Sequence, residues 1–153
     1  MKNYTYFVLF SIDSDKFAIP YEKVIEATKS VEITTLPYQT KRLNGIINFH
    51  GKIIPVVNIR KIMMRPEKQL SISDSFIMLT TSDNSMMAII ADSVHELIKP
   101  ESGKITDIES ILPDYDLYEG TIKSAETLIP IINTDKLMSK KEKAVLESTN
   151  LTT

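Results

Sequence analysis

The sequence has no cysteine, two histidines and four glycines among its 153 residues. Without cysteine the chain has no disulfide, no thiolate nucleophile and no thiolate metal ligand, and this absence suits a reducing compartment. His50 and His95 have no third ligand near either of them at a metal-site spacing. The chain also lacks the glycine-rich and hydrolase motifs that position phosphates or nucleophiles. We therefore predict no catalytic residues, no cofactor and no metal.

Neither positive nor negative charge is in large excess. The chain has 18 Lys and Arg against 20 Asp and Glu, for a formal net charge of −2. This balance gives no basic footprint for nucleic acid. Asp13 and Asp15 end the first apolar run too early for a signal peptide, and Lys52 and Arg60 interrupt the richest one. We expect a soluble, cytoplasmic protein that binds no nucleic acid and is not inserted into a membrane.

The chain contains an internal repeat. The stretch from Gly45 to Met63 and the stretch from Gly120 to Met138 align without a gap, and the glycine, the proline and the asparagine of the first recur in the second. A weaker repeat relates the segment from Phe17 to the segment from Met87. Since a solenoid needs at least three units, two copies predict a pair of similar small subdomains that pack together.

Short apolar segments with alternating residues predict a mostly β protein made of small barrels. His50 and Gly51 form the expected tight turn between two strands, since glycine readily adopts positive φ. Pro55 and its repeat counterpart Pro130 cannot donate to a sheet, so we place each at an edge or a bulge. Pro20 is expected to begin a short helix that carries Glu26. Ser139 caps a second helix, at about 139–148, before a flexible tail at 149–153.

Four segments occur in the order and spacing of CheW domains, and the resemblance covers the chain from about Tyr6 to Met138. They are FAIPYEKVIEA, LNGIINFHGKIIPVVNIRKIM, IIADSVHELI and YEGTIKSAETLIPIINTDKLM. The resemblance implies two SH3-like five-stranded β-barrels around a shared apolar core. We expect residues 1–148 to form this single domain, with one lobe at about 12–70 and the other at about 75–138.

The same resemblance implies a function. CheW domains are non-catalytic adaptors that join the cytoplasmic tips of chemoreceptors to the regulatory domain of a CheA-type histidine kinase, and they also contact other CheW-like domains. We therefore expect a free-standing adaptor that is recruited to membrane-bound receptor arrays. The alternatives are a small-molecule sensor built on paired barrels and, as a residual possibility, an enzyme. A sensor requires a pocket with converging polar groups.

The resemblance also suggests functional residues. Those expected to contact the receptor are Val24, Glu26, Ala27, His50 and Val94. Family members commonly have arginine at the position of His50. For Val24 the alternative is a core residue, and for Glu26 it is a solvated face.

Other positions are expected to serve a second contact or the fold itself. Tyr115 is an aromatic anchor for a contact with the kinase or with another adaptor, together with Leu112. Its alternative role is to cover the second barrel. The residues expected to shape the barrels are Gly45, Gly51, Pro55, Gly120 and Pro130.

Overall fold

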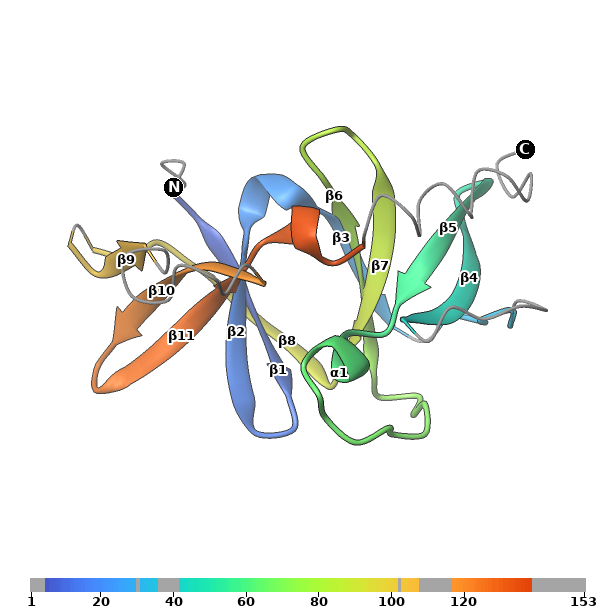
Figure 1. The fold of residues 1–153 in the computed structure, drawn as a ribbon, viewed down its shortest axis with the longest axis horizontal. Helices are drawn as coiled ribbons and strands as arrows, with labels where there is room; N and C mark the ends of the chain where they lie inside the picture. The colour runs from blue at the N-terminus through green and yellow to red at the C-terminus, as the bar shows by residue number, and fades with distance from the viewer. Residues whose placement is uncertain (1–4, 30, 36–41, 102, 108–116, 139–153) are drawn as a thin grey trace.

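The computed structural model describes residues 5–29, 31–35, 42–101, 103–107 and 117–138, and nearly all of its regular structure is β (Figure 1). The strands are β1 (Phe7–Ile12), β2 (Asp15–Pro20), β3 (Val24–Lys29), β4 (Leu43–Phe49), β5 (Lys52–Val57), β6 (Ser75–Thr80), β7 (Met86–Ala91), β8 (Ser93–Ile98), β9 (Ile105–Asp107), β10 (Tyr118–Ser124) and β11 (Thr127–Ile132). The helices are short: η1 (Tyr21–Lys23), α1 (Ile59–Ile62) and η3 (Thr134–Lys136).

The strands form two sheets, which confirms the predicted mostly β fold with few, short helices. One sheet has six strands in the order β8-β1-β2-β11-β10-β9, and the other has five in the order β3-β6-β7-β5-β4 (Figure 1). Each sheet contains strands from both halves of the chain. The hairpin β1–β2 joins the C-terminal strands, while β3 pairs with β6 and β8 pairs with β1. Each copy of the repeat therefore contributes its first hairpin to one sheet and its later strands to the other.

The repeat is visible in the strand register. Ile46 lies opposite Pro55 in one hairpin, and Thr121 lies opposite Pro130 in the other. Each hairpin has a register shift just before its glycine, between Leu43 and Gly45 or between Tyr118 and Gly120. Equivalent single bridges then join each hairpin to its sheet, Val56 to Ala88 and Ile131 to Ala18. The two copies thus have the same local geometry.

Both prolines lie in strands with a neighbour on each side, so the expectation of an edge strand is wrong. The order of the sheets places β5 between β7 and β4, and β11 between β2 and β10. Pro55 and Pro130 are each adjacent to a residue that takes part in the register shift. On the side away from its hairpin partner, each strand pairs with its neighbour through a single bridge. The missing N–H of the proline therefore removes few hydrogen bonds from a regular ladder.

Gly45 allows a close approach between two segments. Its φ is +150°, and a Cβ added there would lie 2.4 Å from the carbonyl oxygen of Thr34. Thr34 and Ile46 exchange backbone hydrogen bonds of 2.9 Å across this contact. A residue with a side chain would therefore push the 31–35 segment away from β4.

The helix expected from Pro20 onward is a strand. Pro20 ends β2, Tyr21–Lys23 make one 3-10 turn, and β3 carries Glu26. The β-branched Val24 and Ile25 favour extended structure, and β6 supplies the hydrogen bonds that a helix this short obtains poorly by itself. His95 lies on β8. The predicted helix at 139–148 and the tail at 149–153 lie outside the described residues.

The largest apolar core is shared by both sheets, as predicted. It includes Phe10 and Phe17 from the six-stranded sheet and Ile77 and Met87 from the five-stranded sheet. Two smaller clusters fill the individual sheets, one around Phe76 and one around Phe7. Each sheet therefore buries some of its apolar residues by itself and the rest against the other sheet.

Candidate functional site

The turn between β4 and β5 presents His50 to solvent. His50 has φ 49° and Gly51 has φ 85°, which confirms the predicted tight turn of positive φ. The N–H of Gly51 donates to Asn48 Oδ1 at 2.9 Å, and the imidazole ring packs against the Phe49 ring at 4.4 Å between centroids. The backbone and the neighbouring ring thus hold this turn in one conformation, with the imidazole outward.

Glu26, on edge strand β3, reaches the same place. Its Oε1 lies 3.7 Å from His50 Nε2, and the side chain of Glu26 is 47% exposed while that of His50 is 73% exposed. The sequence predicted both residues as contacts, and the curvature of the sheet brings β3 to the β4–β5 turn. An exposed pair of this kind contributes little to stability, about 0–1 kcal/mol. Glu26 and His50 are therefore free to exchange this contact for one with a partner.

The other predicted receptor contacts lie along the two outer strands β3 and β8. Ala27 is exposed on β3, and so is Ile25, which sequence reasoning did not single out. Val24 and Val94 are partly buried and pack against the shared core. The apolar exposure of Ile25 gave no separate signal in the sequence, because an apolar residue on a predicted helix is ordinarily assigned to the core.

A network of ion pairs joins the two sheets, and the sequence did not reveal it. Arg60, at the start of α1, donates to Asp13 in the β1–β2 turn and to Asp92 in the β7–β8 turn, each at 3.0 Å. Arg65 donates to Asp13 at 3.1 Å and to Asp15 at 2.6 Å. In the sequence Asp13 and Asp15 only end an apolar run, and the fold shows that they face arginines. Arg65 first, and then Arg60, hold the pKa of the Asp13 carboxyl below its usual value.

A second part of the network fixes the segment that leads to β6. Lys68 donates to Asp74 Oδ1 at 2.6 Å, and the N–H of Ser71 donates to Asp74 Oδ2 at 2.8 Å. Burial by itself would raise the pKa of Asp74, but the Lys68 ammonium and the Ser71 N–H outweigh it and keep the pKa below its usual value. The Asp74 side chain is only 3% exposed, so loss of the Lys68 ammonium would leave a buried carboxylate without its cation.

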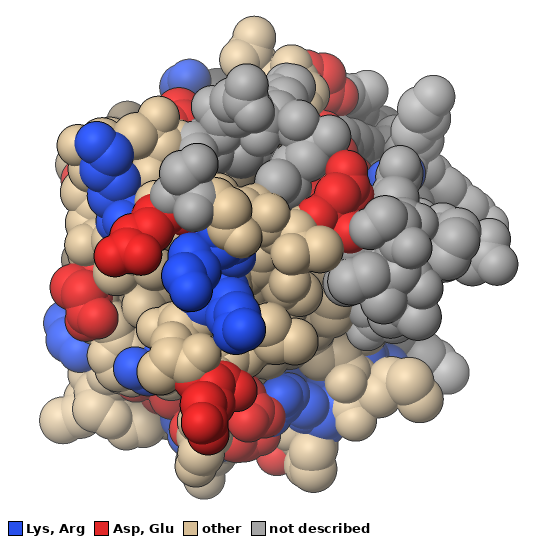
Figure 2. Space-filling view, turned by 90° about the vertical axis from the view of Figure 1, so that its left-hand side faces the viewer, with Lys and Arg blue, Asp and Glu red and all other residues tan. Residues whose placement is uncertain are grey.

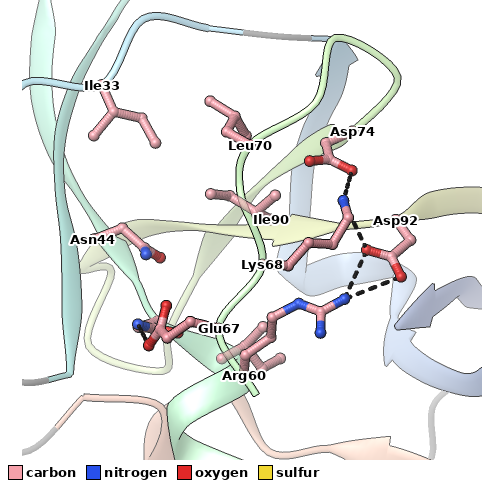
Figure 3. Close-up of a pocket in the computed structure, with 11 residues that line it drawn as sticks. Ile33, Asn44, Arg60, Glu67, Lys68, Leu70, Asp74, Ile90 and Asp92 are labelled. Atoms are coloured by element: carbon pink, nitrogen blue, oxygen red, sulfur yellow. Dashed lines mark hydrogen bonds and ion pairs between the residues drawn. The ribbon is translucent and has the colours of Figure 1, made fainter. Parts of the chain in front are cut away.

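A cavity of about 180 Å³ lies beside this network, between α1, β4 and the segment before β6 (Figure 3). Ile33, Leu70 and Ile90 form its apolar side, and Arg60, Lys68, Asp74 and Asp92 pair with one another on the opposite side. It is smaller than the roughly 300–1,000 Å³ typical of small-molecule sites. The polar groups that converge here are largely bound to each other, which gives the sensor alternative little support.

The described residues contain no group of three His, Cys, Asp or Glu side chains placed to hold a metal ion. Their helices are all too short or too polar to cross a membrane. On the face shown in Figure 2, acidic and basic side chains alternate and do not gather into a patch of one sign. Tyr115 and Leu112 lie outside the described residues, so their predicted role as a kinase or ring contact stays a prediction.

Comparison with known proteins gives the family. Residues 6–142 match the family described as the CheW-like domain. Chemotaxis protein CheW of Helicobacter pylori is 24% identical over 136 residues, which cover 88% of this chain and 81% of that protein. CheW of Bacillus subtilis is also 24% identical, and there the shares are 88% and 86%. The crystal structure of the scaffolding protein TtCheW from Thermoanaerobacter tengcongensis superposes with a TM-score of 0.75 at 28% identity, covering 85% of this chain and 89% of that one. The chain therefore belongs to the CheW-like domain family.

Proposed function

We propose that this protein is a non-catalytic adaptor that couples chemoreceptors to a CheA-type histidine kinase in chemotaxis. The observation that carries the proposal is the family match over residues 6–142. It is supported by the names of the relatives, which are chemotaxis proteins, and by the scaffolding role stated for the similar structure. The proposed location is the cytoplasm, at arrays of membrane-bound receptors.

The geometry suits an adaptor better than an enzyme or a sensor. An adaptor needs a rigid body with separate exposed faces, whereas a catalyst needs reactive groups that converge. The shared core and the Arg60 network hold the two sheets together, and the Glu26–His50 contact lies on the outer strand and turn of one sheet. We assign this contact, with Ala27 beside it, to the receptor.

The assignment predicts that charge at Glu26 matters for one partner only. Glu26→Lys reverses the charge beside His50 and leaves the core intact, because the side chain is half exposed. Binding to a soluble fragment of a receptor tip is expected to weaken about threefold to tenfold, more strongly at low salt. Binding to the kinase regulatory domain is expected to stay unchanged. Isothermal calorimetry against each partner measures both.

Glu96 provides a matched control, since it occupies the position of Glu26 in the other copy of the repeat and is exposed on β8. Glu96→Lys makes the same change in net charge and is expected to bind both partners like the parent protein. Equal weakening by the two variants would show an effect of net charge and contradict the site. A parent protein that binds neither partner would contradict the coupling role itself.

The kinase or ring contact is assigned to Tyr115 and Leu112 on the family resemblance alone. Aromatic residues dominate interface hot spots, so Tyr115→Ala is expected to weaken the kinase contact by roughly 1–2 kcal/mol and to spare the receptor. Circular dichroism controls for folding. A folded Tyr115→Ala variant that binds the kinase normally would remove this assignment and leave the receptor site untouched.

A further inference from the structure

The segment from Met64 to Ile72, here called the 64–72 loop, exposes three large apolar side chains while two of its cations are paired with acids of the protein body. Arg65 points toward the body of the protein, where it binds Asp13 and Asp15, and Lys68 binds the buried Asp74. Apolar side chains instead face solvent: Met64 is 92% exposed, Ile72 is 87% exposed and Leu70 is 43% exposed. Apolar groups held outward on a fixed loop are typical of a surface that a partner covers.

The backbone conformation of Met64 is a second unfavourable feature of this loop. Helix α1 ends in a Schellman motif, in which the N–H of Met64 bonds to the Lys61 carbonyl and the N–H of Arg65 bonds to the Arg60 carbonyl. The residue in the left-handed position of this motif is usually glycine. Here it is Met64, with φ 59°, so a large side chain stands where the backbone disfavours one. Folding alone gains nothing from that side chain, since it contacts solvent.

The cavity beside the loop has one apolar side, and two of its polar side chains, Glu67 and Asn44, can form further hydrogen bonds. Leu70 belongs both to the loop and to the apolar side, which it forms with Ile33 and Ile90 (Figure 3). Glu67 stands at the edge, and its Oε1 accepts a hydrogen bond of 2.9 Å from Asn58. The side-chain amide of Asn44 also lines the cavity, and it makes no hydrogen bond within the described part of the chain. An apolar side chain fits one side, and a polar group is needed at the other.

The charges around the cavity indicate the sign of that polar group. Arg60 is paired with Asp92, and Lys68 is paired with Asp74. The carboxylate of Glu67 has no cationic partner in the described residues and is exposed. The edge of the cavity therefore carries one uncompensated negative charge, which a lysine or arginine complements.

We infer that the 64–72 loop and its cavity form a docking surface for an extended segment of a partner protein in which an apolar side chain adjoins a lysine or arginine. The apolar side chain enters between Ile33, Leu70 and Ile90. The adjoining cation meets Glu67, and a backbone or amide group of the segment bonds to Asn44. This surface is built from α1 and the loop, whereas the proposed receptor contact is built from β3 and the β4–β5 turn. The inference does not depend on coupling between receptor and kinase.

The test titrates a short synthetic peptide into the isotope-labelled full-length protein and follows backbone amide signals by NMR. The probe is a capped Gly-Ser-Leu-Lys-Ser-Gly peptide. Saturable shifts are expected at Asn44, Leu70 and Ile90. A peptide with Glu in place of Lys, or with Ser in place of Leu, is expected to bind at least about threefold more weakly.

Two variants of the protein make the test specific. Glu67→Lys is expected to invert the preference, so that the peptide with Glu binds more tightly than the peptide with Lys. Glu101→Lys makes the same charge change at an exposed site outside the loop and is expected to keep the parent preference. Dispersed spectra show that each variant is folded.

Three results would overturn the inference. They are the absence of saturable shifts, equal binding of the two charged peptides by the parent protein, and a charge preference that Glu67→Lys leaves unchanged. If the same signals shift with protein concentration alone, the surface binds a second copy of this chain and the proposed partner segment is wrong.

Discussion

The two copies of the repeat build equivalent hairpins whose tips differ. In the first copy His50 and Gly51 form the turn, and Glu26 on β3 lies against it. At the same position of the second copy stand Ala125, with φ 54°, and Glu126. Among the described residues, Glu96 on β8 forms no ion pair that would match the one of Glu26. The copies share the residues that shape the strands and differ in those that face solvent.

The copies differ again directly after their second strand. Asn58 accepts a hydrogen bond from Lys61 N–H and begins α1, and Asn133 accepts one from Asp135 N–H and begins η3. Two residues on, the charge is opposite: Arg60 pairs with acids of both sheets, while Asp135 binds Ser82 in the β6–β7 turn. The same capped turn therefore joins different parts of the molecule. The following predictions test how far the copies are interchangeable.

The largest expected effect on stability is a difference between substitutions of two glycines in the first hairpin. Gly45→Ala places a Cβ 2.4 Å from the Thr34 carbonyl oxygen, at a φ that side chains disfavour. We expect the free energy of unfolding to fall by about 3 kcal/mol. Gly51→Ala meets no atom within 4 Å and is expected to cost about 1 kcal/mol. Urea denaturation measures both, and equal losses would mean that the close approach to Thr34 does not matter.

The second prediction concerns the ion-pair network around Arg60 in the first copy. Arg60→Ala leaves Asp92 and Asp13 without their shared cation, and the arginine side chain is only 12% exposed. We expect a loss of about 2 kcal/mol in the free energy of unfolding. The neighbouring Lys61 is exposed, so Lys61→Ala is expected to change stability by less than about 0.5 kcal/mol. Similar losses for both variants would place the effect in α1 itself.

The third prediction is a dependence on pH. The pKa of Asp13 and the pKa of Asp74 are lowered in the folded protein, so their stabilisation is fully present above the unfolded pKa of about 3.9 and is lost as pH falls below it. We expect the free energy of unfolding to decline below about pH 4. Asp74→Asn is expected to lower stability at pH 7 by about 1–2 kcal/mol and to make the acid decline shallower. An unchanged slope in this variant would contradict the role of Asp74.

The smallest expected effect is a gain in the second hairpin. Ala125 has φ 54° in a turn, where glycine has no steric penalty. Ala125→Gly is therefore expected to raise the free energy of unfolding by about 0.5 kcal/mol, because the relief of strain exceeds the added chain entropy. Thermal melting detects this change. A lower melting temperature would mean that the turn tolerates Ala125 without strain.

The sequence alone predicted the parts of this fold that depend on local pattern. The repeat and the His50–Gly51 turn follow from spacing and from residues with special backbone preferences, and the shared core is what the family resemblance implied. The exchange of the β1–β2 and β6–β7 hairpins between the two sheets was not predictable, because strand pairing between distant segments leaves no local signal. Similarly, Asp13 and Arg60 have ordinary positions in the sequence, and their contact depends on how α1 packs. Glu26 was expected on a helix and lies on β3, and its exposure is similar in a short helix and in an outer strand.

The pairing of β1 with β8 has a consequence for how the protein is made. Phe7 lies opposite Ile98, so the first strand pairs with one that a ribosome adding about 5–20 residues per second completes roughly 5 to 20 s later. Contacts this distant in sequence slow folding, because a long chain must close before they form. During synthesis the β1–β2 hairpin has unpaired outer edges, which are available for pairing with another nascent chain. We expect newly made protein to be most prone to aggregation before β8 leaves the ribosome.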